Sequence, residues 1–304
     1  MLCWAVALTW LQPLTEPVKP WADIVVENNT YWVRDVRWAM IVLALVSLVW
    51  AWRGDLKRTA FGTLAAVGWI GADTWLDRLD VAGTAMTVTL SLVAVGVVLA
   101  AHLFTTSGTS RPRPAVLAIA ATVTATLAGL FSALRTPFPE HDPVAAAAAV
   151  LSCSLAIVIA MGCASSIHGR FATSAVVFTV VFIGLATGVV FLPWQYLLWG
   201  SVLVTALAQV AVAGRVLASP ITIIGYTVST IILVPIGLVL SFSTMVADTF
   251  LQPGGYFTAW ADNVRMSTAD TEALFALNAV VIGAIVGSAI ALVARNRTPA
   301  PSIQ

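Results

Sequence analysis

Three aspartates and a tryptophan recur along the segment 59–80 at the spacing of one helical face. Trp69, Asp73, Asp77 and Asp80 stand at positions i, i+4, i+8 and i+11. At about 100° per residue they fall within a stripe about 80° wide. Neighbouring carboxylates can donate or accept protons, and an indole face can stabilise a developing cation. This stripe is therefore the first candidate for a chemical site.

Asp73 is the most informative residue of the stripe. It lies about one turn inside the apolar segment 59–76, where an unpaired carboxylate is costly. One hypothesis makes it the general acid of an active site. The other is structural, with Asp73 paired to Arg34 or Arg37 across a helical bundle. In that case Asp77 and the residues after it are simply the solvated end of a helix.

Small residues continue the stripe toward the start of the same segment. Gly62 and Ala66 both fall on this face. Small side chains either let a neighbouring helix approach closely or leave room for a ligand. The pattern alone allows both outcomes.

A loop in which aromatic and acidic residues alternate precedes the segment 36–52. It contains Trp21, Asp23, Glu27 and Trp32. Such close alternation is not typical of an ordinary membrane-interface belt, in which Trp and Tyr occur without clustered acids. We therefore expect the loop to contribute to the same site as the stripe.

Other tryptophans have a simpler interpretation. Amphipathic rings suit the headgroup region of a bilayer, so Trp is enriched at both membrane interfaces. We expect this belt role for Trp4, Trp10, Trp50, Trp52, Trp194 and Trp199.

Acids and indoles together favour a membrane-embedded enzyme. A carboxylic acid can protonate an alkene or epoxide, and indole faces can stabilise the resulting cation. In this hypothesis Asp73 is the general acid and Asp77 or Glu27 its partner. The substrate-binding residues are Trp69, Trp21, Trp32, Asp23 and Asp80. The substrate would be an apolar or isoprenoid-like small molecule, and the reaction would be of the terpene-cyclase type without a cofactor.

The composition is that of a membrane protein and excludes several partners. Hydrophobic residues make up 60% of the chain and charged residues 10%, against roughly 25% charged in soluble domains. With a formal net charge of +1 the chain has no basic patch for nucleic acid. Cys3, Cys153 and Cys163 match no metal or disulfide spacing, so we expect neither.

Nine apolar stretches are long enough to cross a bilayer, which takes about twenty residues. They are approximately Val36–Trp52, Thr59–Leu76, Gly83–Phe104, Ala115–Leu134, Pro143–Cys163, Phe171–Leu192, Gln195–Val216, Ile221–Val246 and Ala273–Ala294. A tenth, Met1–Leu14, lacks the basic start and the cleavage site of a signal peptide. The sequence therefore predicts an all-α, polytopic bundle of about ten transmembrane helices, with nine as the alternative.

Charge segregation predicts the orientation of this bundle. Basic residues gather in alternate loops: Arg53, Lys57, Arg58, Arg111, Arg113, Arg170, Arg215, Arg295 and Arg297. Of the fourteen acids, only Asp55 shares these loops. Because positive loops mark the cytoplasm, we expect a multi-pass protein of the cell membrane with a cytoplasmic C-terminus. Residues 1–297 would form a single domain in the lipid bilayer, followed by a short cytoplasmic tail, 298–304.

The main alternative to an enzyme is a multi-pass transporter or permease for a small or amphiphilic solute. Ten spans allow two inverted five-helix halves, a common transporter plan. The spans hold almost no charge near their middle, although ion-coupled carriers usually need some. No ATP-binding motif is present, so active transport would use a gradient or a partner ATPase. A membrane sensor, immunity or assembly protein is the third hypothesis.

Overall fold

The fold was analysed in a computed structural model that describes residues 1–16, 30–105, 113–131, 134, 136, 138–165, 243, 246, 247, 250–264 and 274–295. Every secondary-structure element in these residues is a helix, which confirms the all-α class for this part of the chain. The predicted spans 171–192 and 195–216 lie outside the described residues, as does almost all of 221–246.

Most of the predicted apolar stretches in the described residues form helices close to the expected bounds. The elements are α1 (Leu2–Val6), the π-helical η1 (Ala7–Leu11), α2 (Gln12–Thr15), α3 (Trp32–Ala51), α4 (Leu56–Arg78), α5 (Thr84–Thr105), α6 (Pro114–Phe131), the 3-10 helix η2 (Pro139–His141), α7 (Asp142–Ser165), α11 (Pro253–Ala261) and α12 (Phe275–Arg295).

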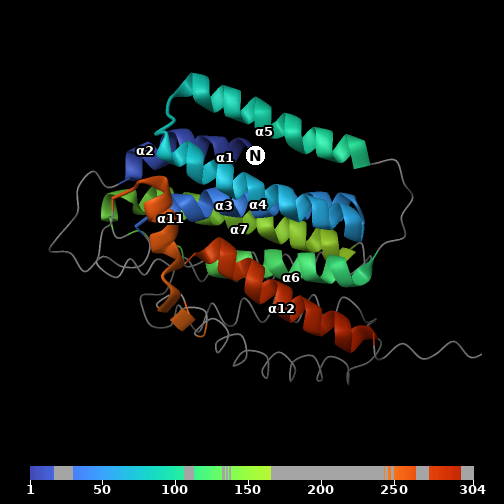
Figure 1. Ribbon diagram of the computed structural model, residues 1–304. Coiled ribbons are helices and arrows are strands. Elements are labelled where there is room, and N and C mark those ends of the chain that lie inside the picture. The colour runs from blue at the N-terminus through green and yellow to red at the C-terminus, as the bar shows by residue number, and fades with distance from the viewer. Residues whose placement is uncertain are drawn as a thin grey trace, which may run out of the picture.

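The long helices lie side by side along a common direction, with α3 in the middle of the bundle (Figure 1). α3 contacts α4, α6, α7 and α12, and the first helix also packs against it. α11 lies across the end of the bundle where α4 finishes. α1, η1 and α2 form one short continuous rod that starts part of the way along the bundle and runs to that same end.

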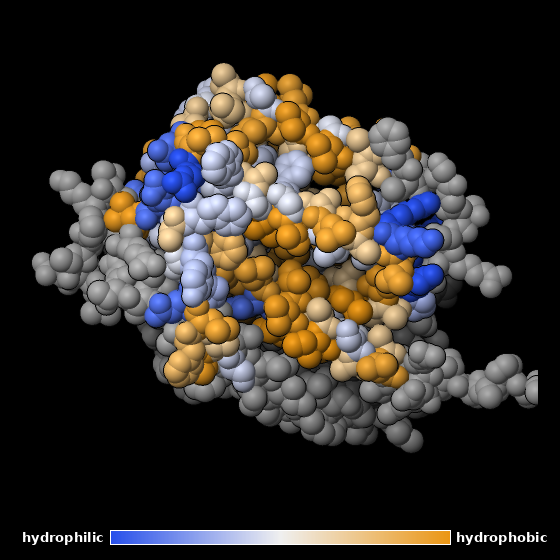
Figure 2. Space-filling model, in the orientation of Figure 1, coloured by the Kyte–Doolittle hydropathy of each residue, from blue (hydrophilic) through white to orange (hydrophobic). Residues whose placement is uncertain are grey.

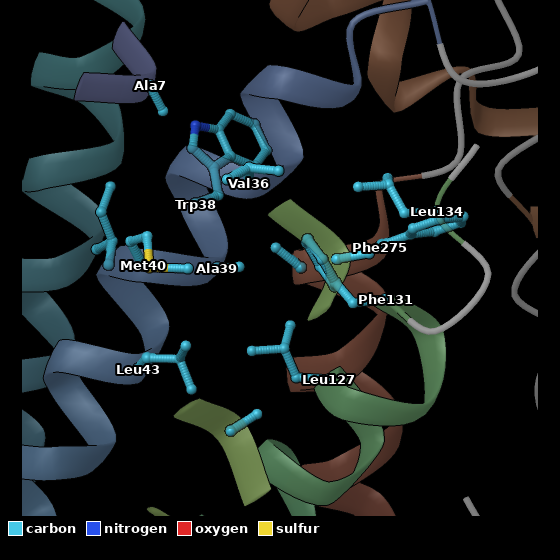
Figure 3. Close-up of a cluster of buried hydrophobic side chains, with 14 of the residues drawn as sticks. Ala7, Val36, Trp38, Ala39, Met40, Leu43, Leu127, Phe131, Leu134 and Phe275 are labelled. Carbon is cyan, nitrogen blue, oxygen red and sulfur yellow. The ribbon is translucent and has the colours of Figure 1, made fainter. Parts of the chain in front are cut away.

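The core forms where α3 faces α6 and α12. Trp38, Met40 and Leu43 on α3 are buried, as are Leu127 and Phe131 on α6. All five belong to one cluster of buried apolar side chains, part of which is drawn in Figure 3. Burying a side chain of this size contributes about 1.5–3 kcal/mol. α3 is thus fixed at the centre, which in turn fixes the polar residues at its start.

α6 and α12 pack closely because α12 carries glycine at two positions four residues apart. A Cβ at Gly283 would lie 2.4 Å from Val123 Cα, and one at Gly287 would lie 2.2 Å from Thr122 Oγ1. Thr122 Oγ1 also donates a hydrogen bond of 2.9 Å to the Gly283 carbonyl. Small residues at this spacing are typical of helix pairs in membranes.

Three of the described helices are long and apolar enough to cross a membrane. They cover Thr84–Leu103, Pro114–Phe131 and Asp142–Cys163. α3 is long enough but carries three charged side chains in its first two turns, and α4 mixes Gly, Thr, Trp and Asp into its apolar run. The predicted count of ten is therefore not reproduced by the described residues, whereas a membrane location is indicated.

The surface supports the same conclusion. α5 lies at the edge of the bundle and exposes large apolar side chains such as Leu92, Val93 and Leu103. Figure 2 shows hydrophilic residues gathered toward the two ends of the helices, with apolar surface between them. Exposed apolar patches of this extent mark a surface that contacts lipid or another protein.

Candidate functional site

A buried arginine joins the two aspartates of the predicted stripe. Arg37 on α3 donates from Nη1 to Asp77 Oδ1 at 2.9 Å and from Nη2 to Asp77 Oδ2 at 2.9 Å. Its Nη2 also lies 3.3 Å from Asp73 Oδ2. All three residues are at least 97% buried. The planar guanidinium fork suits a carboxylate in this two-bond geometry.

Asp73 has two further donors, both indole N–H groups. Trp4 Nε1 donates to Asp73 Oδ1 at 2.8 Å, and Trp38 Nε1 donates to Asp73 Oδ2 at 2.9 Å. The pairing of Asp73 predicted by the structural hypothesis is thus found with Arg37. Arg34 donates instead to Thr258 Oγ1 on α11, at 3.0 Å. The other half of that hypothesis is wrong, because Asp77 is buried and not part of a solvated helix end.

Helical spacing explains how three separate elements meet here. Asp73 and Asp77 are one turn apart on α4, so both carboxylates reach the same guanidinium. Arg37 and Trp38 are adjacent on α3, and Trp4 comes from the first helix. Asp73 thereby ties α4 to α1 and to α3. We call Trp4, Arg37, Trp38, Asp73 and Asp77 the buried network.

The electrostatics of the buried network are unbalanced. Two carboxylates face one guanidinium, so the ionised groups carry one more negative than positive charge. Burying charges costs several kcal/mol per ion unless good geometry and hydrogen bonds offset the loss of water. The indole N–H groups of Trp4 and Trp38 supply part of this compensation. A network of this kind is a place where a proton or a cation is stabilised.

Trp69, Asp73 and Asp77 lie on α4 as the predicted stripe requires, whereas Asp80 lies beyond the end of the helix. Trp69 stacks edge-on against Trp4, with ring centroids 5.3 Å apart, so it borders the buried network. α4 stops at Arg78, and Asp80 has a positive φ of 48° beyond the helix end. Asp80 therefore leaves the helical face predicted for it, although it remains near Asp77 in the cleft described next.

An open cleft of about 450 Å³ lies at the end of the bundle, beside the buried network. Its acidic lining residues are Glu16, Asp77, Asp80 and Asp262, and the others are Leu8, Gln12, Pro13, Arg78, Val81, Ala261, Asn263 and Val264. Asp77 belongs to both features, so the buried network meets the cleft through this one carboxylate. We call this cavity the acidic cleft.

Glu16 is the titratable group of the acidic cleft that stands out. The pKa of its carboxyl is raised from 4.5 to about 7, mainly by burial and also by the neighbouring charges of Asp77 and Asp80. Arg37 and a hydrogen bond with the Gln12 side chain act in the opposite direction. A carboxyl group with a pKa near 7 exchanges its proton in the physiological range.

The remaining predicted site residues either lie outside the described residues or do not line the acidic cleft. Trp21, Asp23 and Glu27 lie outside the described residues. Trp32 is buried in the apolar core and does not line the acidic cleft. A Cβ added at Gly62 would lie 2.8 Å from the Trp52 ring. This small residue therefore makes room for a neighbouring side chain and not for a ligand.

Some residues of the site escaped the sequence analysis. Trp4 and Trp52 were expected in an interfacial belt, but both are buried, at 2% and 3% exposed. Glu16 was not singled out among the fourteen acids, although burial raises the pKa of its carboxyl. The helix α11, Pro253–Ala261, is also absent from the predicted elements.

Nothing in the described part of the chain brings three His, Cys, Asp or Glu side chains close enough to hold a metal ion. Comparisons with protein-family models, with curated proteins and with solved structures gave no match.

Proposed function

We propose that the protein is a multi-pass membrane transporter for a small solute, driven by a proton gradient. The single observation that carries the proposal is the continuity between the acidic cleft and the buried network through Asp77. Ionisable residues in the interior of membrane bundles mark substrate, ion and proton pathways. Glu16 then exchanges protons with water, and Asp77 and Asp73 are the carboxylates further in.

Arg37 supports this proposal as a switchable partner. It contacts both aspartates, at 2.9 Å and 3.3 Å, so protonation of either one changes which carboxylate holds the guanidinium. Alternating access needs an element with two arrangements whose balance is shifted by ligand binding. A guanidinium shared between two carboxylates on neighbouring turns of α4 is such an element.

The enzyme hypothesis stays a prediction, and the contacts support it less. A general acid must reach its substrate within hydrogen-bond distance. Both oxygens of Asp73 already accept hydrogen bonds from indoles, and Asp73 does not line the acidic cleft. A proton-donating role for Asp73 would require these contacts to open first.

Proton flux in proteoliposomes tests the proposal. Vesicles containing the purified protein and an internal pH-sensitive dye are given an outward pH gradient and a panel of small solutes. We expect protein-dependent, solute-dependent decay of the gradient, with at least a tenfold loss in Asp77→Asn. Glu140→Gln is the matched control, because Glu140 is an exposed acid on η2 that does not line the cleft.

Two outcomes would count against a transporter. One is the absence of solute-dependent flux for the whole panel in folded wild-type protein. The other is conversion of polyprenyl substrates by the purified protein, which would support the enzyme instead. If Asp77→Asn fails to fold, Asp80→Asn and Glu16→Gln probe the same pathway from its exposed side.

A further inference from the structure

The acidic cleft has the size and charge of a binding site for an organic cation. Its volume of about 450 Å³ falls within the range of small-molecule pockets, roughly 300–1,000 Å³. Four carboxylates line it, and Arg78 is the basic residue of its lining. Arg78 pairs at 3.7 Å with Asp262, and both side chains are well exposed, so this pair is weak.

The spacing of these carboxylates argues against a metal ion. Metal binding needs several oxygen ligands within about 2–2.6 Å of one point. No group of three His, Cys, Asp or Glu side chains in the described residues could provide this. The carboxylates are instead distributed around an open volume, which suits a larger cation.

Gln12 gives an independent indication of what this cation carries. Its side chain is 4% exposed and lines the cleft, and its Oε1 has no hydrogen-bond partner among the described residues. The rest of its amide group is satisfied, because the side chain hydrogen-bonds to Glu16. Buried acceptors are nearly always paired, so this unpaired oxygen beside the cleft is suited to accept a hydrogen bond from an N–H donor.

We propose that the acidic cleft binds a small organic cation with N–H donors, that is, a protonated amine. Asp80 and Asp262 supply the negative charge, Glu16 adds to it when its carboxyl is ionised, and Gln12 Oε1 accepts an N–H of the ammonium group. The inference rests on the proposed transport function in that the amine would be the transported solute. Asp77 then links the bound cation to Arg37, because a cation beside Asp77 competes with the guanidinium for the same carboxylate.

A pair of matched probes tests this directly. Butylammonium and butyltrimethylammonium have the same charge and chain, but only butylammonium can donate N–H. Binding to the full-length protein in detergent is followed by ligand-observed NMR titration at constant ionic strength. We expect saturable binding of butylammonium and about tenfold weaker binding of butyltrimethylammonium, because a charge-assisted hydrogen bond is lost.

Variants separate charge from hydrogen bonding. Asp80→Asn should weaken both probes by about tenfold, since both carry the same charge. Gln12→Leu should weaken butylammonium and leave butyltrimethylammonium unchanged. Glu140→Gln should affect neither. Thermal unfolding of each variant is measured alongside, so that loss of fold is separated from loss of binding.

Three results would overturn the inference. They are no saturable binding of butylammonium, equal affinity for the two probes, and displacement of butylammonium by an equal concentration of Mg²⁺. The test is independent of transport: solute-driven proton flux without amine binding would overturn this inference alone. Amine binding without solute-driven proton flux would overturn only the proposed transport function.

Discussion

Arg37 and Asp77 form a buried, two-bond ion pair in which Nη1 and Nη2 of the guanidinium each lie 2.9 Å from a different carboxylate oxygen. Because the same guanidinium contacts Asp73, removing it would leave two carboxylates without their cation. Breaking a buried pair from one side costs about 3–5 kcal/mol. We expect Arg37→Met to lower the free energy of unfolding by this order and Arg37→Lys by less, measured by denaturant unfolding in detergent. An equal effect of both variants would show that charge alone does not hold the site together.

The indole contacts of Asp73 should be measurable one at a time. Trp4→Phe keeps an aromatic ring but removes the N–H that reaches Asp73 Oδ1. Hydrogen bonds to charged groups contribute about 1.5–3 kcal/mol, so a loss of that order is expected in unfolding experiments. Trp75→Phe is the matched control, because Trp75 is 54% exposed on the same helix as Asp73. Similar losses at both positions would contradict the role given to Trp4.

Glu16 should make stability depend on pH. Its folded pKa is raised from 4.5 to about 7, so the folded state holds this proton more tightly than the unfolded state does. The stabilisation is complete below pH 4.5 and is lost as the pH rises through about 7. Glu16→Gln should remove this part of the pH dependence of the melting temperature. A variant with the same pH profile as the wild-type protein would show that Glu16 titrates normally.

Gly283 should tolerate no side chain. A Cβ there would lie 2.4 Å from Val123 Cα, which forces α6 and α12 apart. Overpacking of this kind typically costs about 1–3 kcal/mol, so Gly283→Ala should lower the melting temperature in detergent. Gly96→Ala is the control, because nothing lies within 4 Å of its position on α5. A harmless Gly283→Ala would mean that the two helices are less closely packed.

Much of the helical framework was predictable because apolar runs were bounded by clear signals. The predicted span Pro143–Cys163 corresponds to α7, Asp142–Ser165, and Gly83–Phe104 to α5, Thr84–Thr105. Proline and glycine at the start of these runs limit where a helix can begin. α11 was missed because Pro253-Gly254-Gly255 is typical of a turn, whereas proline is also favoured in the first turn of a helix.

The partners within the site were predictable only in part. The i, i+4 spacing identified Asp73 and Asp77 as one group, but Arg34 and Arg37 are about one turn apart on the same face of α3. Spacing alone could not choose between them. The choice depends on α11, whose Thr258 accepts a hydrogen bond from Arg34. The role of Trp4 could not be predicted from the sequence either, because its hydrogen bond to Asp73 joins residues 69 positions apart and depends on how the helices pack.

The order of the buried network along the chain has a consequence for biosynthesis. Trp4, Arg37 and Trp38 all precede Asp73 and Asp77, so every partner of the two acids named here is made before them. A buried carboxylate in the apolar interior of a membrane bundle is costly unless it has partners. As the ribosome adds α4, the donors that offset this cost are already present in the nascent protein. α4 can thus pack into the apolar interior with hydrogen-bond donors for its two acids already in place, whereas a chain with the reverse helix order would have to hold the acids there alone.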